Sequence, residues 1–312
     1  MPEIITIGEM LVEIMTKTRG QSFLNTGELL GPYPSGAPAI FIDQVAKMGV
    51  NCGIVSKVGN DQFGEMILTR LINDGVDVSQ VQISDEFTTG TAFVTYFEND
   101  SRHYIFHLNQ SASAYIDISK FPESFIENCK YLHIMGCSIS VSDTVANAIV
   151  EIAKAAKLRG ALISFDPNIR IELKQTEIMK NVLKEVLDIS DIILSSESEI
   201  ASLHNLLDID NKSENLFESE FKLIILKNGS KGVKVFDGLT YEFIEPYIVD
   251  EVDPTGAGDC FDGAFLAMML NGRSVHDAAI IANAAGALSV TKQGPMEGVF
   301  CYNEILRFIN EN

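Results

Sequence analysis

The sequence has few basic residues. Its 23 lysines and arginines stand against 43 aspartates and glutamates, which gives a formal net charge of −20 at pH 7. Because binding to a nucleic-acid backbone needs clustered basic side chains, this deficit argues against nucleic acid as a partner. The chain also lacks a run of about eighteen uncharged apolar residues, so we expect no membrane-spanning helix. Its first residues carry no basic segment typical of a secretory signal, and we therefore expect a cytoplasmic protein.

Cysteine is scarce and shows no pattern. The five cysteines, at positions 52, 129, 137, 260 and 301, form no Cys-x-x-Cys pair and no metal-ligand spacing, so we expect reduced, mostly buried thiols. Internal repeats, heptads, low-complexity tracts and linkers are absent from the sequence as well. What is present is an apolar fraction of 46% in 312 residues, which is enough for the large core of one α/β domain.

Short β-rich runs alternate with amphipathic helical patterns along the chain. The expected strands are 4–7, 54–58, 131–135, 161–166, 191–194 and 223–227, and the expected helices include 39–48, 63–74, 143–159, 176–187 and 197–207. This alternation predicts an α/β fold, with a mostly parallel central sheet covered by helices on both faces. Ligands of such sheets bind beyond the carboxyl ends of the strands.

A pattern of two strands joined by a turn interrupts this alternation. Residues 89–97 and 102–108 are expected to be strands, and 98–101 the turn between them. A lone hairpin is marginal in water, so it must pair with further strands, for which 8–34 offers candidates, or with another subunit.

We therefore expect a single domain over 1–312 with a small β-sheet lid drawn from about 9–34 and 87–115. The same argument predicts a homodimer formed through the lid, because the hairpin cannot bury both of its faces alone. The apolar residues expected on the covered face include Phe93, Tyr96 and Phe106.

The most informative segment is Asp253-Pro-Thr-Gly-Ala-Gly-Asp-Cys-Phe-Asp-Gly263, which opens an apolar helical pattern. Gly256, Ala257 and Gly258 leave their backbone N–H groups uncovered, so a helix N-terminus here would present donors and a partial positive charge to a phosphate. Asp259 would lie beside this anion site, where a carboxylate can accept a proton from an attacking hydroxyl. The alternative interpretation is a glycine-rich turn with Asp259 as an ordinary capping residue.

The segment resembles the second signature of the ribokinase, or PfkB, family of carbohydrate kinases, Asp-Thr-x-Gly-Ala-Gly-Asp-x-Phe-x-x-Gly. Pro254 and Thr255 stand at the two positions after the first Asp. It is not a P-loop, which needs Gly-Lys-Ser/Thr after four spacer residues. The resemblance implies a ribokinase-like fold, Asp259 as the catalytic base, and ATP with Mg²⁺ as cofactors, with K⁺ as a further candidate. It also implies that backbone donors of Gly256, Ala257 and Gly258 steady the transferring phosphoryl group.

Further segments match the sugar-binding parts of this family. Ser35-Gly-Ala-Pro-Ala-Ile40 resembles the first signature, Gly-Gly-Ala-Pro-Ala-Asn, in which Gly36 permits close approach of a sugar to the backbone. Asp166-Pro-Asn-Ile-Arg170 resembles the Asp-x-Asn-x-Arg motif of the sugar-acid and ketose kinases, and Arg170 can offer a planar fork to a carboxylate or phosphate. Without the resemblance, the first segment is a turn into a helix, and Arg170 of the second segment forms a surface ion pair. The residues assigned to the sugar are Glu13, where Asp is usual, Gly36, Phe93, His107, Asp166, Asn168 and Arg170.

Other segments resemble the nucleotide side of the family's site. Lys227-Asn-Gly-Ser-Lys-Gly232 matches the loop Lys/Thr-x-Gly-x-x-Gly, and its alternative interpretation is a hairpin turn. In the family the small-residue helix around Asn283 flanks the adenine, although tight helix packing explains the small residues equally well. Glu199 keeps the acid of an Asn-x-x-Glu motif and would hold waters of a hydrated magnesium ion. The residues assigned to the nucleotide are Lys227, Gly229, Gly232 and Asn283.

We predict an ATP-dependent sugar kinase that phosphorylates a primary hydroxyl of a ketohexose, tagatose or fructose. A 2-keto-3-deoxygluconate kinase is the alternative within the same branch; sugar-acid kinases typically add a second Arg on the returning lid strand, where this chain has Leu108. A nucleoside or vitamin kinase would need ring-stacking aromatics, which the sequence does not identify. A non-catalytic nucleotide-binding regulator would most simply have lost its base, and Asp259 is present.

Overall fold

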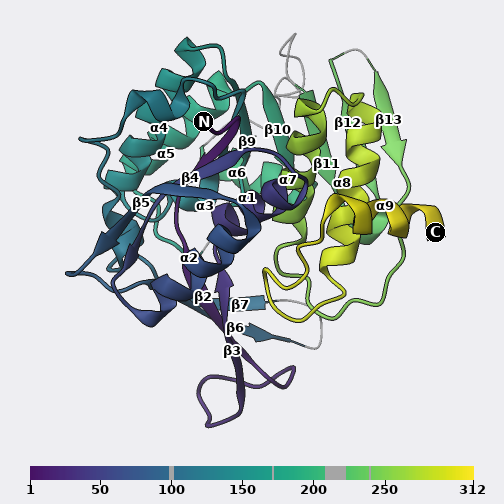
Figure 1. The fold of residues 1–312 in the computed structure, drawn as a ribbon. Coiled ribbons are helices and arrows are strands. Elements are labelled where there is room, and N and C mark those ends of the chain that lie inside the picture. The colour runs from purple at the N-terminus through teal and green to yellow at the C-terminus, as the bar shows by residue number, and fades with distance from the viewer. Residues whose placement is uncertain (98–101, 171, 208–222, 239) are drawn as a thin grey trace.

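The computed structural model describes residues 1–312 except 98–101, 171, 208–222 and 239. Within this part of the chain, a large sheet has the strand order β13-β12-β11-β10-β9-β8-β1-β4-β5 (Figure 1). Its strands are β1 (Ile4–Ile7), β4 (Cys52–Gly59), β5 (Asp77–Ser84), β8 (Tyr131–Met135), β9 (Leu162–Asp166), β10 (Ile192–Ser195), β11 (Leu223–Lys227), β12 (Val233–Phe236) and β13 (Tyr241–Ile244). The strands from β11 to β5 along this order run parallel, and β12 and β13 are added antiparallel.

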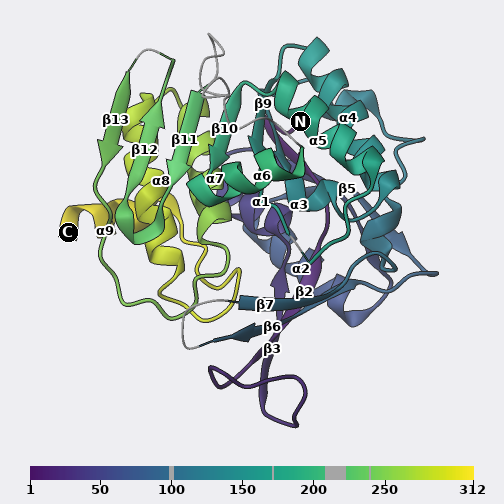
Figure 2. The same cartoon turned by 180° about the vertical axis from the view of Figure 1, so that it is seen from behind.

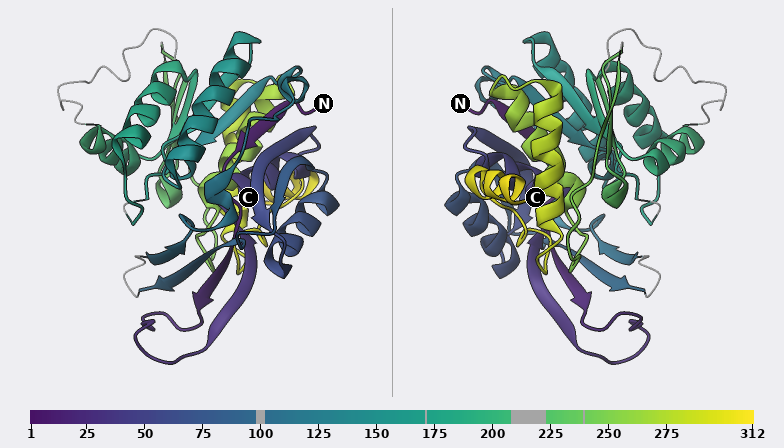
Figure 3. Two further views of the ribbon diagram at one scale, coloured as in Figure 1. Left: turned by 90° about the vertical axis from the view of Figure 1, so that its left-hand side faces the viewer. Right: turned by 90° about the vertical axis from the view of Figure 1, so that its right-hand side faces the viewer.

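Helices cover both faces of this sheet, as the side views in Figure 3 show. One face carries α1 (Ala37–Lys47), α2 (Gln62–Asp74), α7 (Ala257–Leu270), α8 (Val275–Ser289) and α9 (Tyr302–Glu311). The other carries α3 (Gly136–Ile139), α4 (Asp143–Leu158), α5 (Glu177–Ile189) and α6 (Glu197–Leu206). None of the helices in the described ranges is long and apolar enough to cross a membrane.

Strand β1 explains why two cores form. Its side chains alternate, so Ile4 joins the core under α1 and α7, while Ile5 and Ile7 join the core under α4 and α5. A strand buried on both faces needs apolar residues at nearly every position, which is the pattern found in a parallel sheet between two helical layers.

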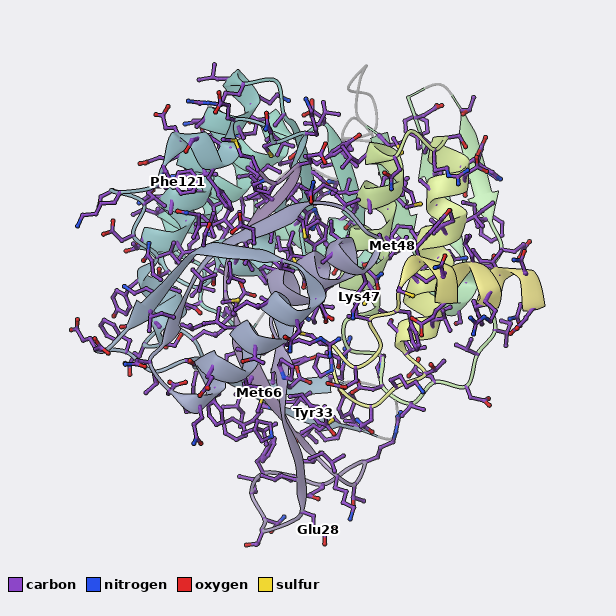
Figure 4. The ribbon with its side chains drawn as sticks, viewed as in Figure 1. Glu28, Tyr33, Lys47, Met48, Met66 and Phe121 are labelled. Carbon is purple, nitrogen blue, oxygen red and sulfur yellow. The ribbon has the colours of Figure 1, made fainter. Side chains whose placement is uncertain are left out.

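A small second sheet projects from one end of the molecule (Figures 1 and 2). It has the order β3-β2-β6-β7 and consists of β2 (Leu11–Thr16), β3 (Leu29–Ser35), β6 (Gly90–Tyr96) and β7 (Arg102–His107). We call it the lid. Figure 4 places Glu28 at its far end and Tyr33 close to the main domain.

The predicted fold class is confirmed, with a mostly parallel sheet, helices on both faces and a separate small sheet. Each strand and helix predicted from the sequence is present, with ends that differ by a residue or two. The predicted turn 98–101 lies outside the described residues. The sequence analysis did not predict β5, α3, β13 and α9.

Candidate active site

Two cavities meet at the start of α7. The first has a volume of about 370 Å³ and lies between the lid and the carboxyl ends of the central strands. The second has a volume of about 220 Å³ and lies beside α8. The residues that line both are Lys227, Gly229, Glu251, Ala257, Gly258 and Val290. A ligand that fills both cavities must therefore pass over the backbone of Ala257 and Gly258.

The anion loop predicted from the sequence is present at this junction. Gly256 is the N-cap of α7 and makes no side-chain capping bond, so no side chain covers the first N–H groups of the helix. Its φ of 85° suits glycine, and a Cβ there would lie 2.7 Å from the carbonyl oxygen of Pro295. The uncovered donors and the helix dipole together form a site for an anion.

Asp259 lies in the first turn of α7, lines the first cavity and is 7% exposed. Burial, reinforced by the nearby Asp166 carboxylate, raises the pKa of Asp259 to about 7, and the Lys227 and Arg170 cations partly oppose the rise. The Nδ2 of Asn168 donates to its Oδ1 at 3.4 Å. A carboxyl group with a pKa near neutrality, facing a cavity, suits a general base.

The turn after β9 brings Asn168 to this position. Asp166 accepts a hydrogen bond from the backbone N–H of Asn168 at 3.0 Å, which closes a tight turn around Pro167. Asn168 itself has a φ of 36°, a left-handed conformation that Asn tolerates better than most residues. Gly136 allows the turn to pack closely, because a Cβ there would lie 2.0 Å from the carbonyl oxygen of Pro167.

Lys227 is held between two buried carboxyl groups. Its Nζ lies 2.9 Å from Asp166 Oδ2 and 2.9 Å from both oxygens of Asp262. Although burial alone would raise the pKa of Asp166, the Lys227 ammonium lowers it, whereas burial holds the pKa of Asp262 well above its usual range. One ammonium thus faces two buried carboxyl groups, and it favours the ionised form of Asp166. The ammonium also lies beside the anion loop, 3.4 Å from where a Cβ on Gly258 would be.

Two further buried carboxyl groups line the first cavity. Burial, and next the Asp253 carboxylate, raise the pKa of Glu13 to about 8. Its Oε2 accepts a hydrogen bond from Ser35, whereas its Oε1 is buried without a partner among the described residues. Burial also raises the pKa of Glu9, whose carboxyl accepts hydrogen bonds from Ser138 and Cys137. At neutral pH a protonated Glu13 can both donate to and accept from the hydroxyls of a sugar.

Arg170 supplies positive charge at the same cavity. It lines the cavity, and its Cζ lies 5.5 Å from the centroid of the Tyr104 ring. Arg170 is half-buried, and within the described ranges its guanidinium makes no hydrogen bond or ion pair. Arg102, on lid strand β7, lines the cavity too. The donors of Arg170 are therefore available to a ligand.

The second cavity is mostly apolar. Its lining beyond the shared residues is Ser230, Val233, Tyr247, Ile248, Val249, Phe261, Asn283, Gly286 and Ala287. Asn283 donates to the carbonyl oxygen of Glu245 at 2.8 Å, so part of its amide is already used. Gly229 lines both cavities, whereas Gly232 shapes the turn before β12, where a Cβ would lie 2.3 Å from the carbonyl oxygen of Ile244. A flat, largely apolar ring system fits this lining.

A dedicated metal cage is absent from the described residues, which contain no group of three or more His, Cys, Asp and Glu side chains that could hold a metal ion. Glu199 lines the first cavity, and its Oε2 accepts hydrogen bonds of 2.8 Å from the backbone N–H and the hydroxyl of Ser196. One carboxylate with bound phosphates and waters is a common environment for Mg²⁺, so these residues fit a hydrated ion.

The lid places two of the predicted sugar residues away from the cavity. Ala92 and Phe106 line it, and because side chains alternate along strands, Phe93 and His107 lie on the opposite face of the lid, where their rings are 5.8 Å apart. We therefore leave both out of the proposed sugar site. Glu13, Gly36, Asp166, Asn168 and Arg170 all line the cavity.

Three residues of the site were missed in the sequence. Glu9 lies two residues after the end of β1, and a polar residue just beyond a central strand was a usable signal. Asp262 lies three residues after Asp259, so on a helix both fall on one face. Tyr104 lines the cavity from β7, and nothing in the sequence distinguished it from other aromatic residues of the hairpin.

Comparisons with known proteins agree with this geometry. A family model described as pfkB family carbohydrate kinase matches residues 1–299. The "Probable fructokinase-5" of Arabidopsis thaliana is 32% identical over 302 residues, which cover 94% of this chain and 93% of that protein. An E. coli protein provisionally named ribokinase II has a similar structure, with a TM-score of 0.92 and 42% identity over 100% of both chains. Its complex with ATP and Mg²⁺ gives a TM-score of 0.90 and 41% identity over 100% of both chains. The chain belongs to the pfkB family of carbohydrate kinases and is itself a carbohydrate kinase.

Proposed function

We propose that this protein transfers the γ-phosphate of ATP to a primary hydroxyl of a ketohexose, with fructose or tagatose as the acceptor. The observation that carries the proposal is the position of Asp259, a buried base beside the anion loop where the two cavities meet. The relative named fructokinase and the related structure with bound ATP and Mg²⁺ support the same assignment.

In this proposal the sugar occupies the first cavity and the adenine the second. Asp259 accepts the proton of the attacking hydroxyl, and Asn168 orients its carboxylate. The backbone N–H groups of Ala257 and Gly258 hold the transferring phosphoryl group, and the Lys227 ammonium adds positive charge beneath them. The lid covers the sugar and limits the access of water, which would otherwise compete as the acceptor.

Glu199 is the residue that would hold the waters of Mg²⁺, which supplies charge neutralisation between phosphate oxygens when bound. We keep K⁺ as a further candidate cofactor, which is tested by comparing turnover in potassium and in tetramethylammonium salts. We also expect the protein to work in the cytoplasm, where its five cysteines, all free thiols, would stay reduced.

The direct test is an assay of ADP release with ATP, Mg²⁺ and a panel of fructose, tagatose, 2-keto-3-deoxygluconate and a nucleoside. We expect the highest kcat/KM with a ketohexose. The phosphorylated position, read by ³¹P-coupled NMR of the product, should be a primary carbon. Turnover with the nucleoside alone would reject the proposal.

The charges of the cavity favour a neutral sugar over a sugar acid. Asp259 lines the cavity and, in the ionised form that serves as the base, would repel a substrate carboxylate. Glu9 and Glu13 line the cavity too, and they add to this repulsion when the pH is high enough to ionise them. Leu108, on the returning side of the lid, supplies no cation. Lys227 also lines the cavity but is paired with Asp166 and Asp262, so Arg170 and Arg102 are left to offset this repulsion. Replacing Arg170 can therefore distinguish the two substrate classes.

Replacing Arg170 tests this choice. If the acceptor is a neutral ketohexose, Arg170→Ala should lower kcat much more than it changes KM for the sugar, because Arg170 then orients phosphate or neighbouring carboxylates. If the acceptor is a sugar acid, the loss should appear in KM for the acid, by about 10- to 100-fold, since a hydrogen bond to a charged group contributes roughly 1.5–3 kcal/mol. Steady-state kinetics of the wild type and Arg170→Ala on fructose and 2-keto-3-deoxygluconate separate the two.

Arg170→Lys is the matched control, because it keeps the charge and removes the planar fork. A higher wild-type kcat/KM for the acid than for either ketohexose would overturn our preference and leave the sugar-acid kinase as the function.

We further propose a homodimer through the lid. Strand β7 is an edge of the lid sheet, and Ile105 on its outer face is 40% exposed beside Phe93. Tyr96 and Phe106 do not belong to this outer face, because Tyr96 is buried against the main domain and Phe106 lines the cavity. Light scattering should give about twice the monomer mass of 34.2 kDa, and Ile105→Lys should shift the mass to the monomer. A wild-type monomer at micromolar concentration would reject the dimer.

A further inference from the structure

The lid is hydrogen-bonded to the loop that leads into α7. Tyr96, the last residue of β6, is 8% exposed, and its hydroxyl donates to Asp253 Oδ1 at 2.8 Å. The hydroxyl of Thr255 lies 2.6 Å from the same Tyr96 oxygen. Because Tyr96 has a single hydroxyl proton and donates it to Asp253, Thr255 is the donor to Tyr96.

Asp253 connects three segments through its two oxygens. Oδ1 also accepts from the backbone N–H of Thr255 at 3.0 Å, and Oδ2 accepts from the Gln293 amide at 3.1 Å and from the backbone N–H of Gly294 at 2.9 Å. The Gln293 amide is in turn 2.9 Å from the sulfur of Met15 on lid strand β2. This side chain, 1% exposed, thus joins the lid, the 293–294 segment and the residue that precedes Gly256.

The contact between Tyr96 and Asp253 lies at the segment that precedes the anion loop, outside the sugar cavity. Tyr96 and Asp253 do not line the cavity, whereas Thr255, Gly256 and Ala257 do. A side chain that touches neither the sugar nor the phosphate can act on the reaction only through the loop that it holds.

We propose that Tyr96 is a positioning residue, whose hydroxyl couples the lid to the anion loop, so that the loop donors are correctly placed only when the lid lies over the sugar. This inference rests on the proposed kinase function. It also predicts low hydrolysis of ATP in the absence of sugar, because a displaced lid would leave the phosphate donors misplaced.

The test is Tyr96→Phe, which removes one oxygen and keeps the ring that packs in the lid against Met15, Val94 and Tyr104. We expect kcat to fall by roughly 10- to 100-fold, the range for loss of a hydrogen bond to a charged group, while KM for the sugar changes little. Tyr33→Phe is the matched control, since Tyr33 lies in the same lid and its hydroxyl makes no hydrogen bond within the described ranges. This control should retain wild-type kcat.

A double-mutant cycle with Thr255 measures the coupling between the lid and the loop. Thr255→Val removes the hydroxyl that donates to Tyr96, and it should lower kcat in the same direction. Because both changes break one network, the double variant should be little worse than Tyr96→Phe alone. Fully additive losses would contradict the coupling.

Amide hydrogen exchange gives a readout that does not require turnover. In the protein without ligands, Tyr96→Phe should increase exchange in both 90–96 and 253–258, whereas Tyr33→Phe should increase it in neither. An increase confined to 90–96, or a kcat of Tyr96→Phe within about twofold of the wild type, would overturn the proposal. A wild type that phosphorylates no sugar would reject the proposed function, and the exchange experiment would still decide the coupling.

Discussion

Asp259→Asn should lower kcat by about 10²- to 10⁴-fold, the usual contribution of a general base. The substitution removes the proton acceptor, while Asn keeps nearly the same volume in a site where the residue is 7% exposed. Binding of ATP should persist, because the anion loop of Gly256, Ala257 and Gly258 is unchanged and a negative charge beside it is lost. Steady-state kinetics together with calorimetric titration of an ATP analogue measure the two effects separately.

The pH dependence of kcat/KM is a second, independent test of Asp259 as the general base. Because the pKa of Asp259 is raised to about 7 in the free protein and the ionised form is the active base, kcat/KM for the sugar should rise with pH through about 7 and then level off. This rise with pH should be absent from the residual activity of Asp259→Asn. Asp277→Asn is the control, since Asp277 occupies the first turn of α8 outside both cavities. Near-normal turnover of Asp259→Asn would remove Asp259 from the role of base.

Much of the anion site could be predicted because its chemistry is local in sequence. The glycine at 256, the uncovered N–H groups and the carboxylate at 259 lie within one helical turn, and a helix start imposes their geometry directly. The turn of Asp166 and Asn168 is likewise local, because it follows a buried strand and is closed by its own side chain.

The lid residues could not be predicted in the same way. Which residues of a strand face the cavity depends on a period of two, so an error of one position exchanges Ala92 for Phe93 and Phe106 for His107. The sequence analysis chose Phe93 and His107 because they are aromatic. The strand register instead places the adjacent residues, Ala92 and Phe106, at the cavity. The partners of Lys227 were hidden for another reason, since Asp166 and Asp262 are distant from it in sequence and only the sheet and α7 bring them together.

This buried cluster gives the largest expected effect on stability. Lys227→Met removes the ammonium and leaves the ionised Asp166, whose side chain is 3% exposed, without its counter-ion. Breaking a buried pair by removing one partner costs about 3–5 kcal/mol. Thermal unfolding should therefore shift to clearly lower Tm, while Lys234→Met, which breaks an exposed pair with Glu197, should leave the Tm nearly unchanged.

The pH dependence identifies the cause of that loss. In the wild type the pKa of Lys227 is raised by Asp166 and Asp262 despite its burial, so its contribution to stability is present at all pH values below the pKa of an unfolded lysine. In Lys227→Met, burial without the ammonium should raise the pKa of Asp166 above its unfolded value, so part of the lost stability should return as the pH falls from 8 to 5 and the carboxylate takes up a proton. Adding Asp166→Asn to Lys227→Met should recover stability at pH 8, because a neutral amide then replaces the carboxylate that lost its counter-ion. If the double variant were instead less stable than Lys227→Met alone, the loss would come from packing and not from the unpaired carboxylate.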